Sequence, residues 1–200
     1  ARGAEAVFLT GNHDPTISDA TPLVCAGGAV LIMHGHGVFR DVTPWSRHRR
    51  WVHATYPEIK GERLTFEERL HRANQIALGM QVDDVGLQGG WRARLLQFYR
   101  EVLHPTGPFR VLKAWIETPD LTRRLVRERF PDLRVVLIGH THLPGVWKRH
   151  PLAVVNTGSF SLPIDRTAAI IKNGEVAVHL VIRTAGRYEL GRCLHRLAVG

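Results

Sequence analysis

Three short loops carry the residue types that suit a metal site. They are Gly11-Asn12-His13-Asp14, His34-Gly35-His36 and Gly139-His140-Thr141-His142. Each loop follows directly on a short apolar run, and apolar runs that end in glycine are typical of buried strands. Polar residues at the carboxyl ends of strands lie where α/β folds bind their ligands. The sequence therefore predicts a polar site assembled from three strand ends.

Four residues in these loops are candidate metal ligands: Asn12, His34, His140 and His142. Neutral imidazole binds Zn, Fe and Mn, and an amide oxygen completes a mixed nitrogen and oxygen set that suits Lewis-acid hydrolysis. Because His140 and His142 are two residues apart on an extended loop, their imidazoles can be directed at two adjacent ions. Two metal ions about 3.5–4 Å apart would clamp a phosphate and activate a water molecule.

The remaining polar residues of the loops are candidates for catalysis and substrate binding. His13 is expected to act as a general acid or to contact phosphate, with Asp14 positioned to orient it. His36 is expected to bind substrate phosphate or to support a ligand from behind. Taken singly, each motif has an ordinary explanation, because a buried histidine is more often a core residue and Asn and Asp favour turns. The presence of all three motifs, each at a strand end, favours the metal site.

The elements that must position these loops are predicted from apolar periodicity. Strands are expected at Val7–Leu9, Ala29–Met33, Arg134–Ile138 and Ala153–Val155, with Gly27-Gly28 forming a turn before the second strand. A hairpin is expected between Ala168–Ile171 and Val176–Val181, because Asn173-Gly174 supplies the positive φ angles of a type I′ turn. Helical spacing occurs at Glu62–Gln81, Trp91–His104 and Pro119–Phe130, the last with Thr118 as N-cap and Pro119 at the first helical position.

Length and composition indicate a globular α/β protein. The 200 residues suit a single domain over 1–200, with a cap-like helical insert at about 44–131. Lys and Arg number 27 against 18 Asp and Glu, and the net charge of +9 favours anionic partners. The sequence contains no apolar run long enough to span a membrane and no visible signal peptide. A cytoplasmic location is expected, with peripheral membrane contact as the alternative.

The combination of motifs resembles the calcineurin-like metallophosphoesterase superfamily. Its pattern runs Asp-x-His, Gly-Asp-x-x-Asp, Gly-Asn-His-Asp/Glu, a histidine beside glycine, and Gly-His-x-His, and this sequence matches the last three in order. The resemblance implies a sandwich of two mixed β-sheets flanked by helices. It implies that Asn12, His34 and His140 ligate one metal, that His142 ligates the other, and that His13 protonates the leaving group. Asn156-Thr157-Gly158-Ser159 is similar to a segment that often follows in these proteins.

The first two motifs of the superfamily have no counterpart in this chain. They include the aspartate that bridges the two metals, and Asp14 belongs to another motif. The chain begins without methionine, so we expect it to be truncated at its N-terminus and the missing motifs to precede Ala1 in the complete protein. The complete protein is then expected to bind two divalent ions (Mn, Fe or Zn), and residues 1–200 one or fewer, with activity impaired or absent.

The substrate class is suggested by a basic cluster in the insert. Arg49 and Arg50 lie between Trp45 and Trp51, and arginine pairs bidentately with phosphate while tryptophan stacks on a base or lies at a lipid interface. This favours a phosphorylated small-molecule or lipid-linked substrate. The pattern is similar in outline to UDP-2,3-diacylglucosamine pyrophosphatases, whose Gly-Asn-Arg-Asp is Gly-Asn-His-Asp here. The cluster is equally compatible with a solvated helix face.

The predicted function is hydrolysis of a phosphomonoester, phosphodiester or pyrophosphate bond by a metallophosphoesterase. Two alternatives remain open: a nuclease, for which the basic charge allows nucleic acid as a partner, and a non-catalytic scaffold of the same fold that binds a protein. The scaffold would gain support if the complete gene lacked the upstream carboxylates. The four imidazoles and the amide argue against it, because a scaffold has no physical need of them.

Overall fold

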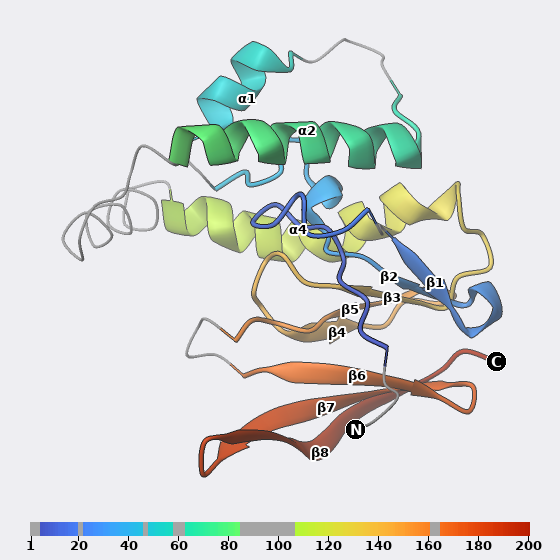
Figure 1. Cartoon of the computed structure of the whole chain (residues 1–200). Coiled ribbons are helices and arrows are strands. Elements are labelled where there is room, and N and C mark those ends of the chain that lie inside the picture. The colour runs from blue at the N-terminus through green and yellow to red at the C-terminus, as the bar shows by residue number, and fades with distance from the viewer. Residues whose placement is uncertain (1–4, 20–21, 46–47, 58–62, 85–106, 161–164) are drawn as a thin grey trace. The chain divides into compact units, whose positions relative to one another are not determined.

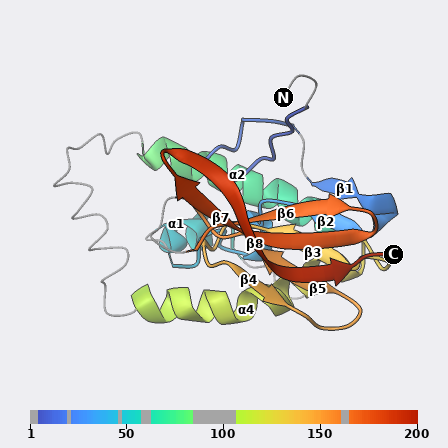
Figure 2. The same ribbon diagram turned by 90° about the horizontal axis from the view of Figure 1, so that it is seen from below.

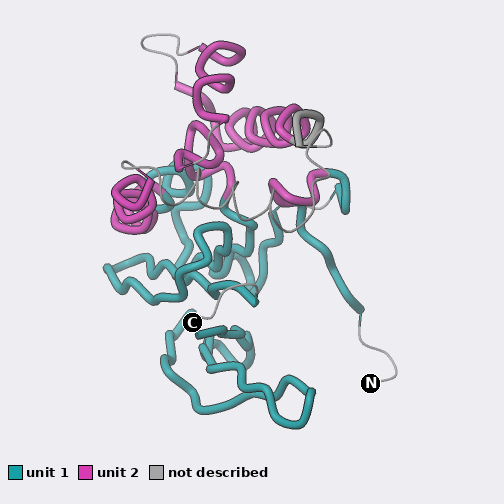
Figure 3. The backbone as a smooth tube through the Cα atoms, turned by 90° about the vertical axis from the view of Figure 1, so that its left-hand side faces the viewer, with its two compact units in different colours: residues 1–10, 16–35, 122–200 teal, residues 11–15, 36–121 magenta. Residues whose placement is uncertain are grey.

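The computed structural model describes residues 5–19, 22–45, 48–57, 63–84, 107–160 and 165–200. The chain forms two compact units, one from residues 1–10, 16–35 and 122–200, and the other from residues 11–15 and 36–121 (Figure 3). Most of the predicted helical insert falls in the second unit. The assignment of residues 1–200 to a single domain stays a prediction.

The first unit contains a mixed five-stranded sheet, here called sheet A (Figure 1). Its strands are β1 (Leu23–Cys25), β2 (Val30–Ile32), β3 (Val135–Ile138), β4 (Gly145–Trp147) and β5 (Ala153–Asn156), in the order β1-β2-β3-β5-β4. β2, β3 and β5 are parallel, whereas β1 and β4 are antiparallel edge strands. The expected strands at 29–33, 134–138 and 153–155 are therefore confirmed.

The first unit also contains an antiparallel three-stranded sheet, here called sheet B. It consists of β6 (Thr167–Lys172), β7 (Glu175–Thr184) and β8 (Arg187–Ala198). Asn173 and Gly174 join β6 to β7 with φ angles of 52° and 70°, so the predicted hairpin is confirmed. A second sheet of mixed strands was expected, and that prediction is wrong. Two-residue turns at 173–174 and 185–186 make consecutive strands antiparallel.

The core of the first unit lies between the two sheets. Buried side chains of both sheets form one apolar cluster: Val30, Val135, Leu137, Val155, Val176, Val178, Leu197 and Val199. β3 is buried at all four positions, as expected for a central parallel strand that is covered on both faces. This core stabilises the strands whose ends carry the predicted ligands.

The prediction of a strand at Val7–Leu9 is wrong. These residues have no regular secondary structure, and the side chains of Val7 and Phe8 are 50% and 60% exposed. An apolar run forms a stable strand only where a neighbour supplies hydrogen bonds and a face to pack against. The Gly11-Asn12-His13-Asp14 motif therefore follows an irregular segment.

The second unit contains the short 3-10 helix η2 (His36–Val38) and the helices α1 (Arg49–Thr55) and α2 (Phe66–Asp84). α2 begins at Phe66 rather than at Glu62 because Thr65 and Glu68 form a capping box. The Glu68 amide donates to the Thr65 hydroxyl (3.2 Å), and the Thr65 amide donates to the Glu68 carboxylate (2.8 Å). Hydrogen bonds to Thr65 lower the pKa of the Glu68 carboxyl group.

Helix α4 (Gly107–Arg127) begins well before the expected start at Pro119. Thr118 is no N-cap, because its hydroxyl donates to the carbonyl of Ala114 within the helix (2.6 Å). The sequence Thr-Pro-Asp is typical of a helix start, but it also fits a helix interior in which the threonine bonds to the preceding turn. The predicted helix Trp91–His104 lies outside the described residues. No helix in the described part of the chain is both long enough and apolar enough to cross a membrane.

The contact between α1 and α2 depends on the absence of a side chain at Gly79. A Cβ atom added there would lie 2.4 Å from Cη2 of Trp51, whose indole ring is rigid. Gly79→Ala would gain about 1 kcal/mol of helix propensity, but overpacking a rigid ring costs about 1–3 kcal/mol. We expect a net loss of about 1 kcal/mol in urea unfolding. Adding Trp51→Leu should reverse the sign of the alanine effect, and an alanine that destabilises equally in both backgrounds would contradict this account.

Candidate metal centre

His34 and His140 lie together at one end of sheet A. His34 follows β2 and His140 follows β3, and these strands are parallel neighbours. Their imidazole centroids are 5.2 Å apart with the rings at 64° to each other. The Gly139 amide donates to the His34 carbonyl (3.0 Å), which joins the two strand ends. The two motifs therefore meet at this end of the sheet, and the role of His34 and His140 as metal ligands stays a prediction.

The loop after β3 has an unusual backbone. His140 and His142 have φ angles of 66° and 61°. These lie in the left-handed region, which residues other than glycine rarely adopt. Such conformations cost about 1–3 kcal/mol each and cluster at functional sites. Opposite this loop, Gly35 has a φ angle of 103°, and a Cβ atom there would lie 3.5 Å from that of His140. A larger residue at position 35 would crowd Ile138 and His140.

Asn156 holds this loop in place from the end of β5. Its side-chain amide donates to the Gly139 carbonyl (2.7 Å) and to the Thr141 hydroxyl (2.8 Å), and its carbonyl oxygen accepts from the Gly158 amide (2.9 Å). The residue is completely buried. Sequence reasoning gave Asn156 no role. The available signals were its position directly after an apolar run and the similarity of Asn156-Thr157-Gly158-Ser159 to a segment of the superfamily.

The donor chemistry of this pair fits a transition-metal ion. Both side chains are imidazoles, His140 is buried and His34 is half-buried, and Zn, Fe and Mn all accept such ligands. Within the described residues, no group of three or more His, Cys, Asp or Glu side chains is arranged as a metal site. The pair would therefore supply part of a coordination shell. His142 is half-buried, two residues beyond His140, and its role as a ligand to a second metal stays a prediction.

The other predicted site residues belong to the second compact unit. Asn12 is buried, whereas His13 and Asp14 are exposed, and their roles as ligand, acid and orienting group stay predictions. His36 is 1% exposed, and its Nε2 donates to the side-chain oxygen of Asn74 on α2 (2.7 Å). Burial lowers the pKa of His36, and the hydrogen bond to Asn74 opposes this. These contacts suit a structural histidine, and a role in substrate binding stays a prediction.

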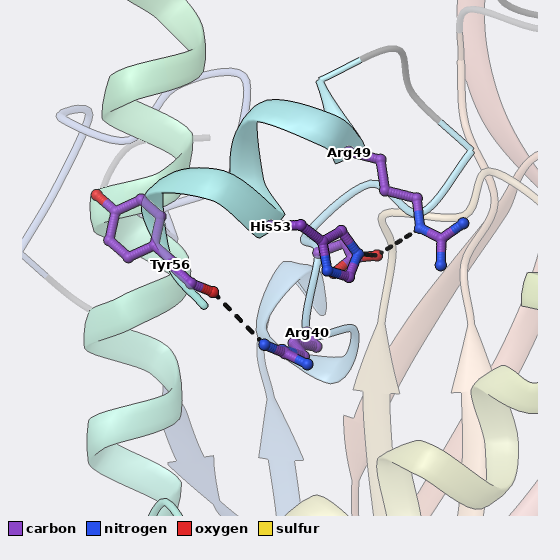
Figure 4. Close-up of polar contacts among 5 residues, drawn as sticks. Arg40, Arg49, His53 and Tyr56 are labelled. Atoms are coloured by element: carbon purple, nitrogen blue, oxygen red, sulfur yellow. Dashed lines mark hydrogen bonds and ion pairs between the residues drawn. The ribbon is translucent and has the colours of Figure 1, made fainter. Parts of the chain in front are cut away.

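The arginine cluster lies at the start of α1, and one of its members is paired. Nε of Arg49 and Nε2 of His53 lie 3.0 Å and 3.1 Å from the same carboxylate oxygen of Asp41 (Figure 4). Arg50 is exposed. Because Asp41 already pairs with Arg49, a substrate phosphate would have to compete for that guanidinium. Sequence reasoning missed this pair, since nothing in the spacing of residues 41 and 49 indicates a contact.

Comparisons with known proteins add little. No protein family model matches the chain, and no curated protein matches it. A solved structure with some likeness is that of Vacuolar Protein Sorting 29 from Cryptosporidium parvum. The sequence identity is 17%, the match covers 40% of this chain and 44% of that one, and the TM-score is 0.30. The chain thus spans less than half the length of the structure it matches, and so slight a likeness carries no argument.

Proposed function

We propose that this protein is a metal-dependent phosphoesterase that hydrolyses a phosphomonoester, phosphodiester or pyrophosphate bond. The observation that carries the proposal is the pair of His34 and His140 at adjacent strand ends. An imidazole pair with no ligand needs no strained backbone, yet His140 has a left-handed conformation. A loop that keeps this strain and is held by a buried asparagine is better explained by a bound ion than by packing.

The chain's own residues would divide the work as follows. His34 and His140, in their neutral forms, would hold one divalent ion (Mn, Fe or Zn), with His142 available to a second and Asn12 completing the first. When bound, the metal would supply Lewis acidity toward a phosphoryl oxygen. His13, which is exposed, would donate a proton to the leaving group, oriented by Asp14.

Metal content and hydrolysis, measured together, test this proposal. The protein expressed from its complete gene should contain two ions per chain by elemental analysis. With Mn²⁺, Fe²⁺ or Zn²⁺ added, it should hydrolyse p-nitrophenyl phosphate, bis(p-nitrophenyl) phosphate or a nucleoside diphosphate sugar. Preference among these probes would identify the type of bond, and cleavage of DNA or RNA instead would identify a nuclease. A folded protein with neither metal nor turnover would overturn the proposal and favour the protein-binding scaffold.

A further inference from the structure

Sheet B has one face packed on sheet A and one face turned away from it. Val176 and Val178 of β7 belong to the core between the sheets, so the alternate positions Glu175, Ala177 and His179 face outward. In Figure 2 the strands β6, β7 and β8 lie in front, with sheet A behind them. This outward surface is called the outer face below.

At one end of the outer face, exposed aromatic rings and arginines are stacked. The rings of Phe160 and Tyr188 are 5.2 Å apart and 54% and 52% exposed. The Arg166 guanidinium carbon lies 5.8 Å and 5.9 Å from the two ring centres, and that of Arg183 lies 5.9 Å from Tyr188. Arg183 pairs with Tyr188 across β7 and β8, which places both on one face.

Arg183 is exposed and available to an outside anion, whereas Arg166 is half-buried. Neither Arg166 nor Arg183 forms an ion pair with any described residue, and Nε of Arg166 is buried with no hydrogen-bond partner among them. Guanidinium groups that pack on aromatic rings keep their outer N–H groups for other acceptors. A ligand with both a flat ring system and negative charge would satisfy rings and cations together.

A cleft opens at the other end of the same face. Its volume is about 370 Å³, and it is lined by Ile170, Lys172, Asn173, Glu175, Ala177, His179 and Arg196. Arg196 pairs with Glu175, whereas Lys172 makes no ion pair with a described residue. His179 Nδ1 donates to the Gly191 carbonyl (3.1 Å), where β7 and β8 shift register. The outer face thus combines a stacking surface with a cleft in which Lys172 has no ion pair with a described residue.

We propose that the outer face of sheet B binds single-stranded nucleic acid. Bases would stack on Tyr188 and Phe160, while phosphates would pair with the arginines beside them and with Lys172 at the cleft. Stacking on exposed aromatic side chains beside basic groups is how proteins hold single strands without strict sequence preference. A duplex fits less well, because its bases are already stacked on one another. An acidic protein surface would pair with the arginines but would leave the exposed rings unused.

Fluorescence anisotropy with a labelled oligonucleotide of about 16 nucleotides tests this inference on the full chain. The buffer contains EDTA and about 50 mM salt, so the result does not depend on the proposed metal centre or on hydrolysis. Tyr188→Ala should weaken binding by between about fivefold and about 100-fold, and Tyr188→Phe should restore it. Arg183→Ala should reduce the slope of the logarithm of the binding constant against the logarithm of the salt concentration by about 0.7.

Phe109→Ala is the matched control, because Phe109 is also an exposed aromatic residue (74%) but lies on α4. It should bind the oligonucleotide as the unaltered protein does. Three results would overturn the inference: no binding at this salt concentration, equal binding by Tyr188→Ala and the unaltered protein, or equal losses in Tyr188→Ala and Phe109→Ala. Polyglutamate binding as tightly as the oligonucleotide would also overturn it and would indicate an acidic protein partner.

Discussion

His140→Ala is expected to abolish metal binding at the candidate centre while leaving the fold in place. The imidazole is one of the two donors at the adjacent strand ends, and its ring packs 5.2 Å from that of His34. Loss of a supporting contact alone lowers metal affinity about 10–100-fold, so loss of a ligand should reduce turnover by at least about 100-fold. The test compares metal content and turnover of the variant and the unaltered protein.

The matched control is His71→Ala, which removes an exposed histidine on α2. It should keep both the metal and the activity. A second variant, His140→Gly, separates the ligand role from backbone strain, because glycine adopts the left-handed conformation freely. His140→Gly should lack the metal as His140→Ala does. Its free energy of unfolding should exceed that of His140→Ala by about 1 kcal/mol. Near-normal turnover in either variant would refute the proposed centre.

Asn156→Ala is expected to damage both stability and metal affinity. The substitution removes three hydrogen bonds and leaves the Gly139 carbonyl and the Gly158 amide without this partner. The Gly139 carbonyl keeps the Thr141 amide as a donor (2.8 Å). Each hydrogen bond that is lost costs about 0.5–1.5 kcal/mol, so the free energy of unfolding should fall by about 2–4 kcal/mol. Metal affinity should fall about 10–100-fold, because the loop that carries His140 loses its support.

Asn156→Asp distinguishes the hydrogen bonds that the side chain donates from the one that it accepts. A carboxylate still accepts from the Gly158 amide, but it cannot donate to the Gly139 carbonyl or to the Thr141 hydroxyl. We therefore expect it to be destabilised as well, because a buried charge would face two oxygen atoms. Urea unfolding and metal titration measure both effects. If the aspartate variant matched the unaltered protein, the donated bonds would have no part in holding the loop.

The central strands could be predicted because they are buried on both faces and carry unbroken apolar runs. Val135–Ile138 is such a run, and Asn173-Gly174 is a strong turn signal. Val7–Leu9 is also an apolar run, but Val7 and Phe8 remain exposed, because a strand also needs a neighbouring strand to pair with. β1 and β4 have three residues each, which is too short for a pattern to be detected.

Of the candidate centre, the part that could be predicted is the part that follows from parallel-strand geometry. Residues that follow neighbouring parallel strands meet at the carboxyl end of the sheet, which brought His34 and His140 together. The left-handed backbone of His140 could not be predicted, since this conformation is uncommon for any residue other than glycine. The pairing of Arg49 with Asp41 depends on the path of an irregular segment, which no periodicity describes.

The chain path between β2 and β3 determines which part of the sequence can vary in evolution without disturbing sheet A. The two strands are hydrogen-bonded neighbours, yet residues 36–121 between them belong to the other compact unit. The entropy of closing such an excursion rises by only about 0.6 kcal/mol for each doubling of its length. Descendants can therefore lengthen, shorten or replace this excursion while inheriting the hydrogen bonds that hold His34 beside His140.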